Sequence, residues 1–159
     1  MSDLVQPFSV AESDEAPALL PALIAVSRSC RQLMQIKLSA LGVMAGQDQL
    51  LDALGPGAPV PVGQLAARLN IRPSTASKMV DKLADHGLLV RVRDAGDARR
   101  TCVALTPSGK EALARVRNIW AELEGDLSDA LAREGSLAAT GQSIDRLADV
   151  LAARLAPLR

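Results

Sequence analysis

Hydrophobic residues recur along most of the chain at the three- and four-residue spacing of amphipathic helices. This spacing predicts a helix that begins at Pro73 and ends before Gly87. It also predicts helices over residues 16–37, 46–54, 63–69, 107–130 and 137–156. Residues 1–14 lack the pattern, so we predict a flexible N-terminus there.

Two of these helices are separated by a short turn. The first ends at Asn70, a residue that tolerates the left-handed conformation found after a helix C-terminus. The second starts at Pro73, where proline suits the first helical turn. Its apolar stripe consists of Ala76, Met79, Val80 and Leu83. The order of helix, turn and helix predicts a helix-turn-helix motif.

Beyond Gly87 the hydrophobic period changes from helical spacing to two. Leu88, Val90 and Val92 alternate with Leu89, Arg91 and Arg93, and a second alternating stretch covers residues 101–105. The residues "DAGD" between the two stretches are typical of a turn. We therefore predict a mainly α protein with a small β-hairpin wing (α+β), in which a winged helix-turn-helix is flanked by N- and C-terminal helices.

Composition limits the class of protein further. The chain has 159 residues, of which 48% are hydrophobic and 23% charged, as in a globular protein of about one domain. Its N-terminus has no basic signal region, and no apolar run approaches the roughly 20 residues of a membrane span. Cys30 and Cys102 lie far apart, which favours reduced thiols. We expect a cytoplasmic protein without a membrane association.

Charge is neutral overall but locally basic. If the apolar stripe of the second helix faces inward, its hydroxyls and lysines face outward, where they can meet base edges and phosphates in a major groove. An ordinary solvated helix face is the alternative. The hairpin favours the first interpretation, because arginines on a wing can enter a narrow minor groove, and Asp97 lies close enough to orient Arg99. The predicted DNA-binding residues are Arg72, Ser74, Thr75, Ser77, Lys78, Lys82, Arg91, Asp97, Arg99 and Arg100.

Catalytic and metal-binding patterns are missing from the sequence. His86 is the one histidine, so neither a histidine-based triad nor a zinc site of His and Cys ligands can be assembled around a second one. The phosphate-binding glycine motifs GxxxxGK[ST] and GxGxxG are also absent. We predict that the chain is not an enzyme and uses no cofactor.

Residues about 40–115 resemble the MarR family of winged-helix transcriptional regulators. The matching stretches are "GQLAARLNI", "PSTASKMVDKLADHGLLVRV" and "DAGDARRTCVALTPSGKEAL". The family's wing motif Asp-x-Arg falls on Asp97 and Arg99, and its Leu-Thr-x-x-Gly motif on Leu105, Thr106 and Gly109. The chain departs from many relatives in having Ala98 directly after the wing aspartate, with Arg100 one place later.

The resemblance implies a homodimer on a pseudo-palindromic site in double-stranded DNA. Residues 15–37 and 107–159 would form the helical dimerisation region, and residues 38–106 the winged helix-turn-helix DNA-binding domain. Candidate interface residues are Leu113, Leu123, Leu147, Leu151 and Leu155. The same residues could instead close the core of a monomer.

The resemblance further implies a repressor that a phenolic or aromatic acid-like molecule releases from DNA. Arg28, Arg31 and Gln35 are candidates for binding such an effector, although ordinary solvated positions are favoured by their residue types. Some relatives sense oxidants with a cysteine near the start of the first helix, but we expect Cys30 to be buried and structural. An oxidant-sensing regulator and a winged-helix protein-interaction module without DNA binding remain the alternatives.

Overall fold

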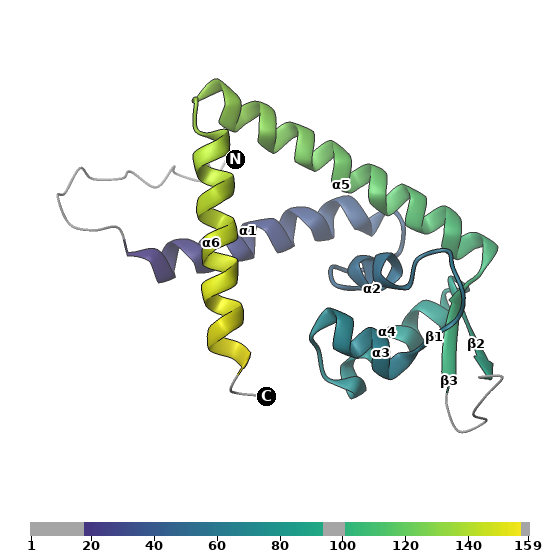
Figure 1. Ribbon diagram of the computed structural model, residues 1–159. Coiled ribbons are helices and arrows are strands. Elements are labelled where there is room, and N and C mark those ends of the chain that lie inside the picture. The colour runs from purple at the N-terminus through teal and green to yellow at the C-terminus, as the bar shows by residue number, and fades with distance from the viewer. Residues whose placement is uncertain (1–17, 94–100, 157–159) are drawn as a thin grey trace, which may run out of the picture.

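The computed structural model describes residues 18–93 and 101–156, which form six helices and three strands (Figure 1). The helices are α1 (Leu19–Ser39), α2 (Gln47–Leu54), α3 (Val62–Leu69), α4 (Pro73–Asp85), α5 (Pro107–Arg133) and α6 (Leu137–Leu155). The strands are β1 (Val60–Pro61), β2 (Leu89–Arg93) and β3 (Thr101–Leu105). The predicted fold class, mainly helical with a small β wing, is confirmed.

The long helices α1, α5 and α6 occupy a different region of the molecule from the winged part, which consists of α2, α3, α4 and the three strands. Figure 1 shows α5 leaving the strands and running to the far end, where α6 turns back. The predicted flexible segment 1–14 lies outside the described residues. In α1 the first helical residue is Leu19, three residues after the predicted start, and Pro21 fits because it stands in the first turn.

The helix-turn-helix consists of α3 and α4, as the sequence predicts. Asn70 follows α3 with φ 59° and ψ 38°, the left-handed conformation, and its N–H bonds back to the carbonyl oxygen of Ala67 at 3.1 Å. Pro73 is the first residue of α4, where its missing N–H has no intrahelical partner to lose. The inner face of α4 buries Ala76, Val80 and Leu83.

The strands form a three-stranded antiparallel sheet in the order β1-β3-β2. The hairpin pairs Leu89 with Leu105 and Arg93 with Thr101. The edge strand β1 was not predicted: its two residues lie in a Gly- and Pro-rich stretch that the sequence marks as a loop. Val60 pairs with Val103 across the sheet, so this strand exists because of its partner and not because of local propensity.

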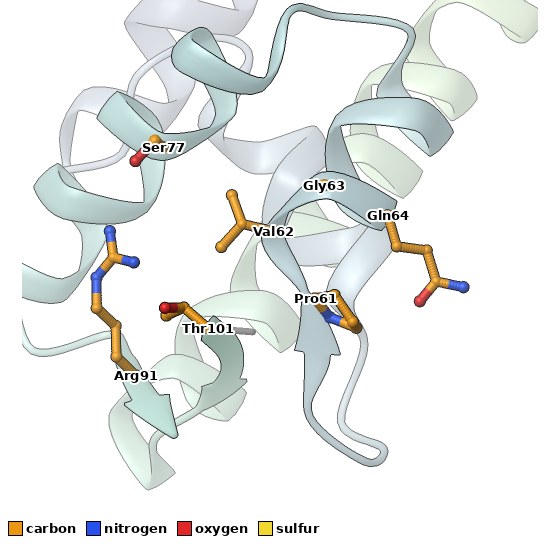
Figure 2. Close-up of a pocket in the computed structure, with 7 residues that line it drawn as sticks. All are labelled: Pro61, Val62, Gly63, Gln64, Ser77, Arg91 and Thr101. Carbon is orange, nitrogen blue, oxygen red and sulfur yellow. The ribbon is translucent and has the colours of Figure 1, made fainter. Parts of the chain in front are cut away.

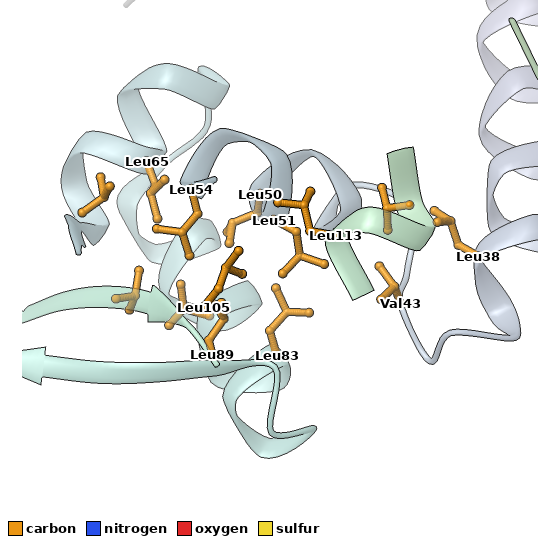
Figure 3. Packing of buried hydrophobic residues seen from close by; sticks show 14 residues of the cluster. Leu38, Val43, Leu50, Leu51, Leu54, Leu65, Leu83, Leu89, Leu105 and Leu113 are labelled. Carbon is orange, nitrogen blue, oxygen red and sulfur yellow. The ribbon is translucent and has the colours of Figure 1, made fainter. Parts of the chain in front are cut away.

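One apolar core joins the winged part to the long helices (Figure 3). Its fully buried side chains come from α2, α3, α4, β3 and α5, with Leu38 and Val43 at the end of α1 and just beyond it. Leu113 belongs to this core and Leu123 is also buried, so both have the monomer-core role that the sequence left open. Leu113, near the start of α5, packs this helix against the winged part through the shared core.

Apolar residues on α1 and α6 remain uncovered in the single chain. Leu38 is the one fully buried residue of α1, and α6 has none. Leu20 is 67% exposed and Leu151 50%. The other large apolar residues of these two helices with high exposure are Leu19, Ile24, Val26, Leu33, Ile36, Leu137, Ile144, Val150 and Leu155. Such a large apolar surface is typical of a protein–protein interface.

Candidate nucleic-acid interface

The outer face of α4 carries the polar side chains that the sequence predicts there. Ser74, Thr75, Lys78 and Lys82 are all exposed, and Ser77 is half-buried. Because Ala76, Val80 and Leu83 point into the core, the hydroxyls and ammonium groups lie on the opposite side of the helix. The first turn of α4 has no acidic residue. A positive and hydrogen-bonding helix surface is therefore presented to solvent.

An ion pair connects this helix to the wing. Arg91 Nη2 on β2 lies 2.5 Å from Asp81 Oδ1 on α4, and both side chains are partly exposed. The sequence placed Arg91 among the DNA-binding residues, and the structure shows that its guanidinium already has a carboxylate partner. Arg91 thus connects the middle of β2 to α4 through an exposed ion pair.

A shallow groove of about 650 Å³ lies between α3, α4 and the sheet (Figure 2). It is lined by Pro61, Val62, Gly63, Gln64, Ser77, Arg91 and Thr101. Figure 2 shows the guanidinium of Arg91 and the hydroxyls of Ser77 and Thr101 around the same opening. Ser77 therefore faces this groove more than open solvent, which explains why it is half-buried.

The remaining predicted contact residues divide into two groups. Arg72 is exposed and directly precedes α4 as its N-cap residue. Asp97, Arg99 and Arg100 at the wing tip lie outside the described residues. Their roles stay predictions from the sequence.

Comparison with known proteins decides the family. The model of the MarR family matches residues 42–100, which include the helix-turn-helix and β2, the first strand of the hairpin. A Thauera aromatica protein named as a transcriptional regulatory protein for the hcr operon is 30% identical over 109 residues, which are 67% of this chain and 66% of that relative. The chain belongs to the MarR family.

Solved structures of transcriptional regulators and of a protein–DNA complex share most of this fold. S. aureus MepR in a complex with DNA is 23% identical, with a TM-score of 0.70, and the likeness covers 85% of this chain and 99% of MepR. Streptomyces coelicolor PcaV in complex with its natural ligand is 25% identical, with a TM-score of 0.66, covering 85% of this chain and 97% of PcaV. MarR-family proteins are transcriptional regulators and not enzymes, in agreement with the prediction.

The three candidate effector residues of this MarR-family chain do not form one site. Arg28 lines an apolar groove between α1 and α6. Arg31 lines both that groove and a cavity of about 240 Å³ between α1 and the start of α2. Gln35 is half-buried, and its Oε1 accepts a 2.9 Å hydrogen bond from the backbone N–H of Ala45. The expectation of ordinary solvated positions is therefore wrong for Gln35, because its side chain ties the α1–α2 loop to α1.

The expectation that Cys30 is buried is also wrong. Cys30 is exposed on α1, a helix whose one buried residue is Leu38. It lines the same cavity between α1 and the start of α2 as Arg31 does. Cys102 on β3 is buried.

Two buried polar residues near that cavity were not found by sequence reasoning. Gln47 and Asp48, the first two residues of α2, are each 3% exposed. The carboxylate of Asp48 accepts a 2.7 Å hydrogen bond from the N–H of Gly46 and a 3.1 Å hydrogen bond from Nε1 of Trp120. An acidic residue beside a glycine at a helix start is a capping signal, but the distant Trp120 partner leaves no mark in the local sequence.

Residues 18–93 and 101–156 contain neither a candidate metal-binding cluster nor a helix that could span a membrane. That part of the chain brings together no group of three His, Cys, Asp or Glu side chains suited to a metal ion. None of its helices has both the length and the apolar character needed to cross a bilayer.

Proposed function

We propose that this MarR-family protein is a dimeric, sequence-specific DNA-binding regulator of transcription that acts in the cytoplasm. The observation that carries the proposal is the outer face of α4, on which Ser74, Thr75, Lys78 and Lys82 are exposed opposite a buried apolar face. An α-helix fits the major groove of B-DNA, where hydroxyls reach base edges and lysines neutralise phosphates. The DNA-bound MepR structure shares this fold, which supports the same use of α4 here.

The wing supplies the second contact in this proposal. Arg99 and Arg100 follow β2 in the chain, and the Asp81–Arg91 pair connects the middle of that strand to α4. In the proposed complex, Arg99 and Arg100 reach the minor groove beside the major groove that α4 enters. An arginine inserted into an adjacent minor groove gains from the strong negative potential there.

Dimerisation follows from the uncovered apolar faces of α1 and α6. Residues such as Leu20, Ile24 and Leu151 are at least half-exposed in the single chain, and a second copy can cover them by an isologous contact. Two copies of α4 would then face a pseudo-palindromic operator. The half-sites would be about one helical turn of DNA apart.

Release by a small molecule is the regulatory part of the proposal. The cavity between α1 and the start of α2 lies where the long helices meet the winged part, and Arg31 at its edge suits an aromatic carboxylate. Such an effector relieves repression only if it binds the DNA-free arrangement more tightly than the DNA-bound one. The ligand-bound PcaV structure, with the same fold, supports an effector of this kind.

The exposed thiol of Cys30 favours a second candidate mode of regulation. A thiol open to solvent in that cavity is accessible to peroxide, and its oxidation would add a polar group where Arg31 and the α1–α2 loop meet. In this mode Cys30→Ser abolishes the response of DNA binding to peroxide. An unchanged response in the variant would exclude oxidant sensing through this residue.

Gel retardation with the intergenic DNA upstream of the protein's own gene tests the main proposal. We expect retardation that persists at physiological salt, and a strong loss of affinity in Arg99→Ala with the dimer intact. Retardation only at low salt would favour the alternative of a protein-interaction module, because non-specific binding to DNA is mostly electrostatic. Unchanged affinity of Arg99→Ala would contradict the wing contact.

A further inference from the structure

The loop Met44–Gly46, between α1 and α2, is held by side chains from two helices. The N–H of Met44 donates to Gln47 Oε1 at 2.9 Å, that of Ala45 to Gln35 Oε1 at 2.9 Å, and that of Gly46 to Asp48 Oδ1 at 2.7 Å. Three consecutive amides thus bond to side chains of α1 and α2. Such a loop has little freedom to move without breaking hydrogen bonds.

Asp48 connects this loop to α5. Its second oxygen, Oδ2, accepts from Trp120 Nε1 at 3.1 Å, while Oδ1 holds Gly46. The carboxylate is buried, so each of these hydrogen bonds is shielded from water. One turn further along α2, Asp52 pairs with Arg117 of α5 at 2.8 Å, but this pair is exposed and contributes less.

The same loop lies next to α4, the helix that is proposed to enter the major groove. Gly46 has φ 101°, and a Cβ at this position would lie 3.3 Å from Cε of Met79 on α4. Ala45 lines both the cavity on the α1 side and a second groove that Lys78, Met79 and Lys82 line on the α4 side. The loop therefore lies between the proposed effector cavity and the lysines of α4 that are proposed to contact DNA.

We infer that Asp48 is a positioning residue for DNA binding, which holds the loop Met44–Gly46 against α5 and thereby sets the position of α4. The inference rests on the proposed function, because it assigns a role in the DNA-binding arrangement of α4. A displacement of the loop from the α1 side reaches Met79 directly, and with it the neighbouring lysines. Coupling between two sites is reciprocal, so DNA binding at α4 also perturbs the Asp48–Trp120 hydrogen bond.

Trp120 makes the coupling measurable, because it is the one tryptophan of the chain. The wild-type protein and Asp48→Asn are titrated with the upstream intergenic duplex while the emission of Trp120 is recorded. The asparagine has the shape of the aspartate but a single acceptor oxygen, so either Gly46 or Trp120 loses its partner. Asp52→Asn is the matched control, with the same chemical change one turn away on α2.

We expect DNA to change the Trp120 emission of the wild type and of Asp52→Asn. In Asp48→Asn that response is lost and the Kd for the duplex rises at least about fivefold, the lower end of typical coupling factors, while the dimer stays intact. A purely structural role would lower the thermal midpoint without removing the response of Trp120 to DNA. If Asp48→Asn does not fold, Trp120→Phe removes the same donor and keeps an aromatic side chain, and labelled DNA reports the same rise in Kd.

The inference would be overturned if Asp48→Asn or Trp120→Phe bound the duplex with the same Kd as the wild type. It would also be overturned if the Trp120 emission of the wild type did not change when DNA binds. In both cases the wild type still binds the duplex, so the proposed function stands. Failure of the wild type itself to bind would instead overturn the proposed function, and the inference with it.

Discussion

Single residues at the start of α5 decide how this helix meets the wing sheet. Thr106 Oγ1 accepts a 3.0 Å hydrogen bond from the N–H of Gly109 and donates one of 2.7 Å to the carbonyl oxygen of Gly87. Gly109 approaches the chain so closely that a Cβ there would lie 1.9 Å from the carbonyl oxygen of Leu88. Threonine is a common N-cap residue, whereas the need for glycine at position 109 follows from the packing.

Gly109→Ala is expected to lower the free energy of unfolding by about 1–3 kcal/mol, because the backbone must shift to admit the methyl group. Gly125→Ala is the matched control on the same helix: a Cβ there has no neighbour within 4 Å, so better helix propensity should raise stability by up to about 1 kcal/mol. Urea unfolding measures both variants. Equal stability of the two would contradict the close approach described for Gly109.

The lysines of α4 can be tested by the salt dependence of binding. Each phosphate contact that Lys78→Ala or Lys82→Ala removes should reduce the slope of log K against log salt by about one. Arg133→Ala, at the end of α5 far from the winged part (Figure 1), removes a positive charge and should leave the slope unchanged. Slopes that fall equally in all three variants would mean that net charge, and not position on α4, governs binding.

The burial of individual polar residues could not be predicted from their residue types. Asp48 and Gln35 have ordinary surface residue types, yet one is buried and the other half-buried. Their partners are Trp120 and Ala45, and Trp120 lies 72 positions further along the chain. Cys30 shows the opposite case, since a residue type that is usually buried is exposed on a helix face without cover.

At the scale of elements, a helix could be predicted where its hydrophobic period and the residues at its ends indicate the same boundaries. α4 starts at Pro73 and α5 at Pro107, as their first-turn prolines indicate. β1 could not be predicted, because its two residues become a strand only by pairing with β3. In β2 the residue that packs into the core is Leu89 and Val90 is 44% exposed, so alternation predicted the strand but not which side faces the core.

The apolar face of α6 gives a prediction for dimerisation. Leu151→Glu should raise the dimer dissociation constant by roughly 100-fold, about 3 kcal/mol, because a carboxylate would be buried at the contact without a partner. Gln142→Glu adds the same charge at another exposed position of α6 and should leave the dimer unchanged. Light scattering during size-exclusion chromatography compares them. A dimeric Leu151→Glu protein at low micromolar concentration would count against α6 as interface.

At the scale of the whole molecule, the basic surface proposed to contact DNA and the apolar surface proposed to form the dimer lie on different elements. The chain has a formal net charge of zero, yet exposed Arg72, Lys78 and Lys82 are gathered on or beside α4. Meanwhile α1 and α6 expose apolar residues. Both tendencies can be read from the sequence as patterns. The close approach of the loop at Gly46 to Met79 of α4, where a Cβ would lie 3.3 Å from the Met79 side chain, depends on tertiary packing that no local pattern encodes.

The most direct test of DNA recognition compares the wild-type protein on two duplexes at physiological salt. One is the intergenic DNA upstream of its own gene, and the other has the same base composition in shuffled order. Fluorescence anisotropy should give a Kd for the first at least about 1000-fold below that for the second, as for specific DNA-binding proteins. Equal dissociation constants for the two duplexes would contradict sequence-specific binding by α4 and the wing.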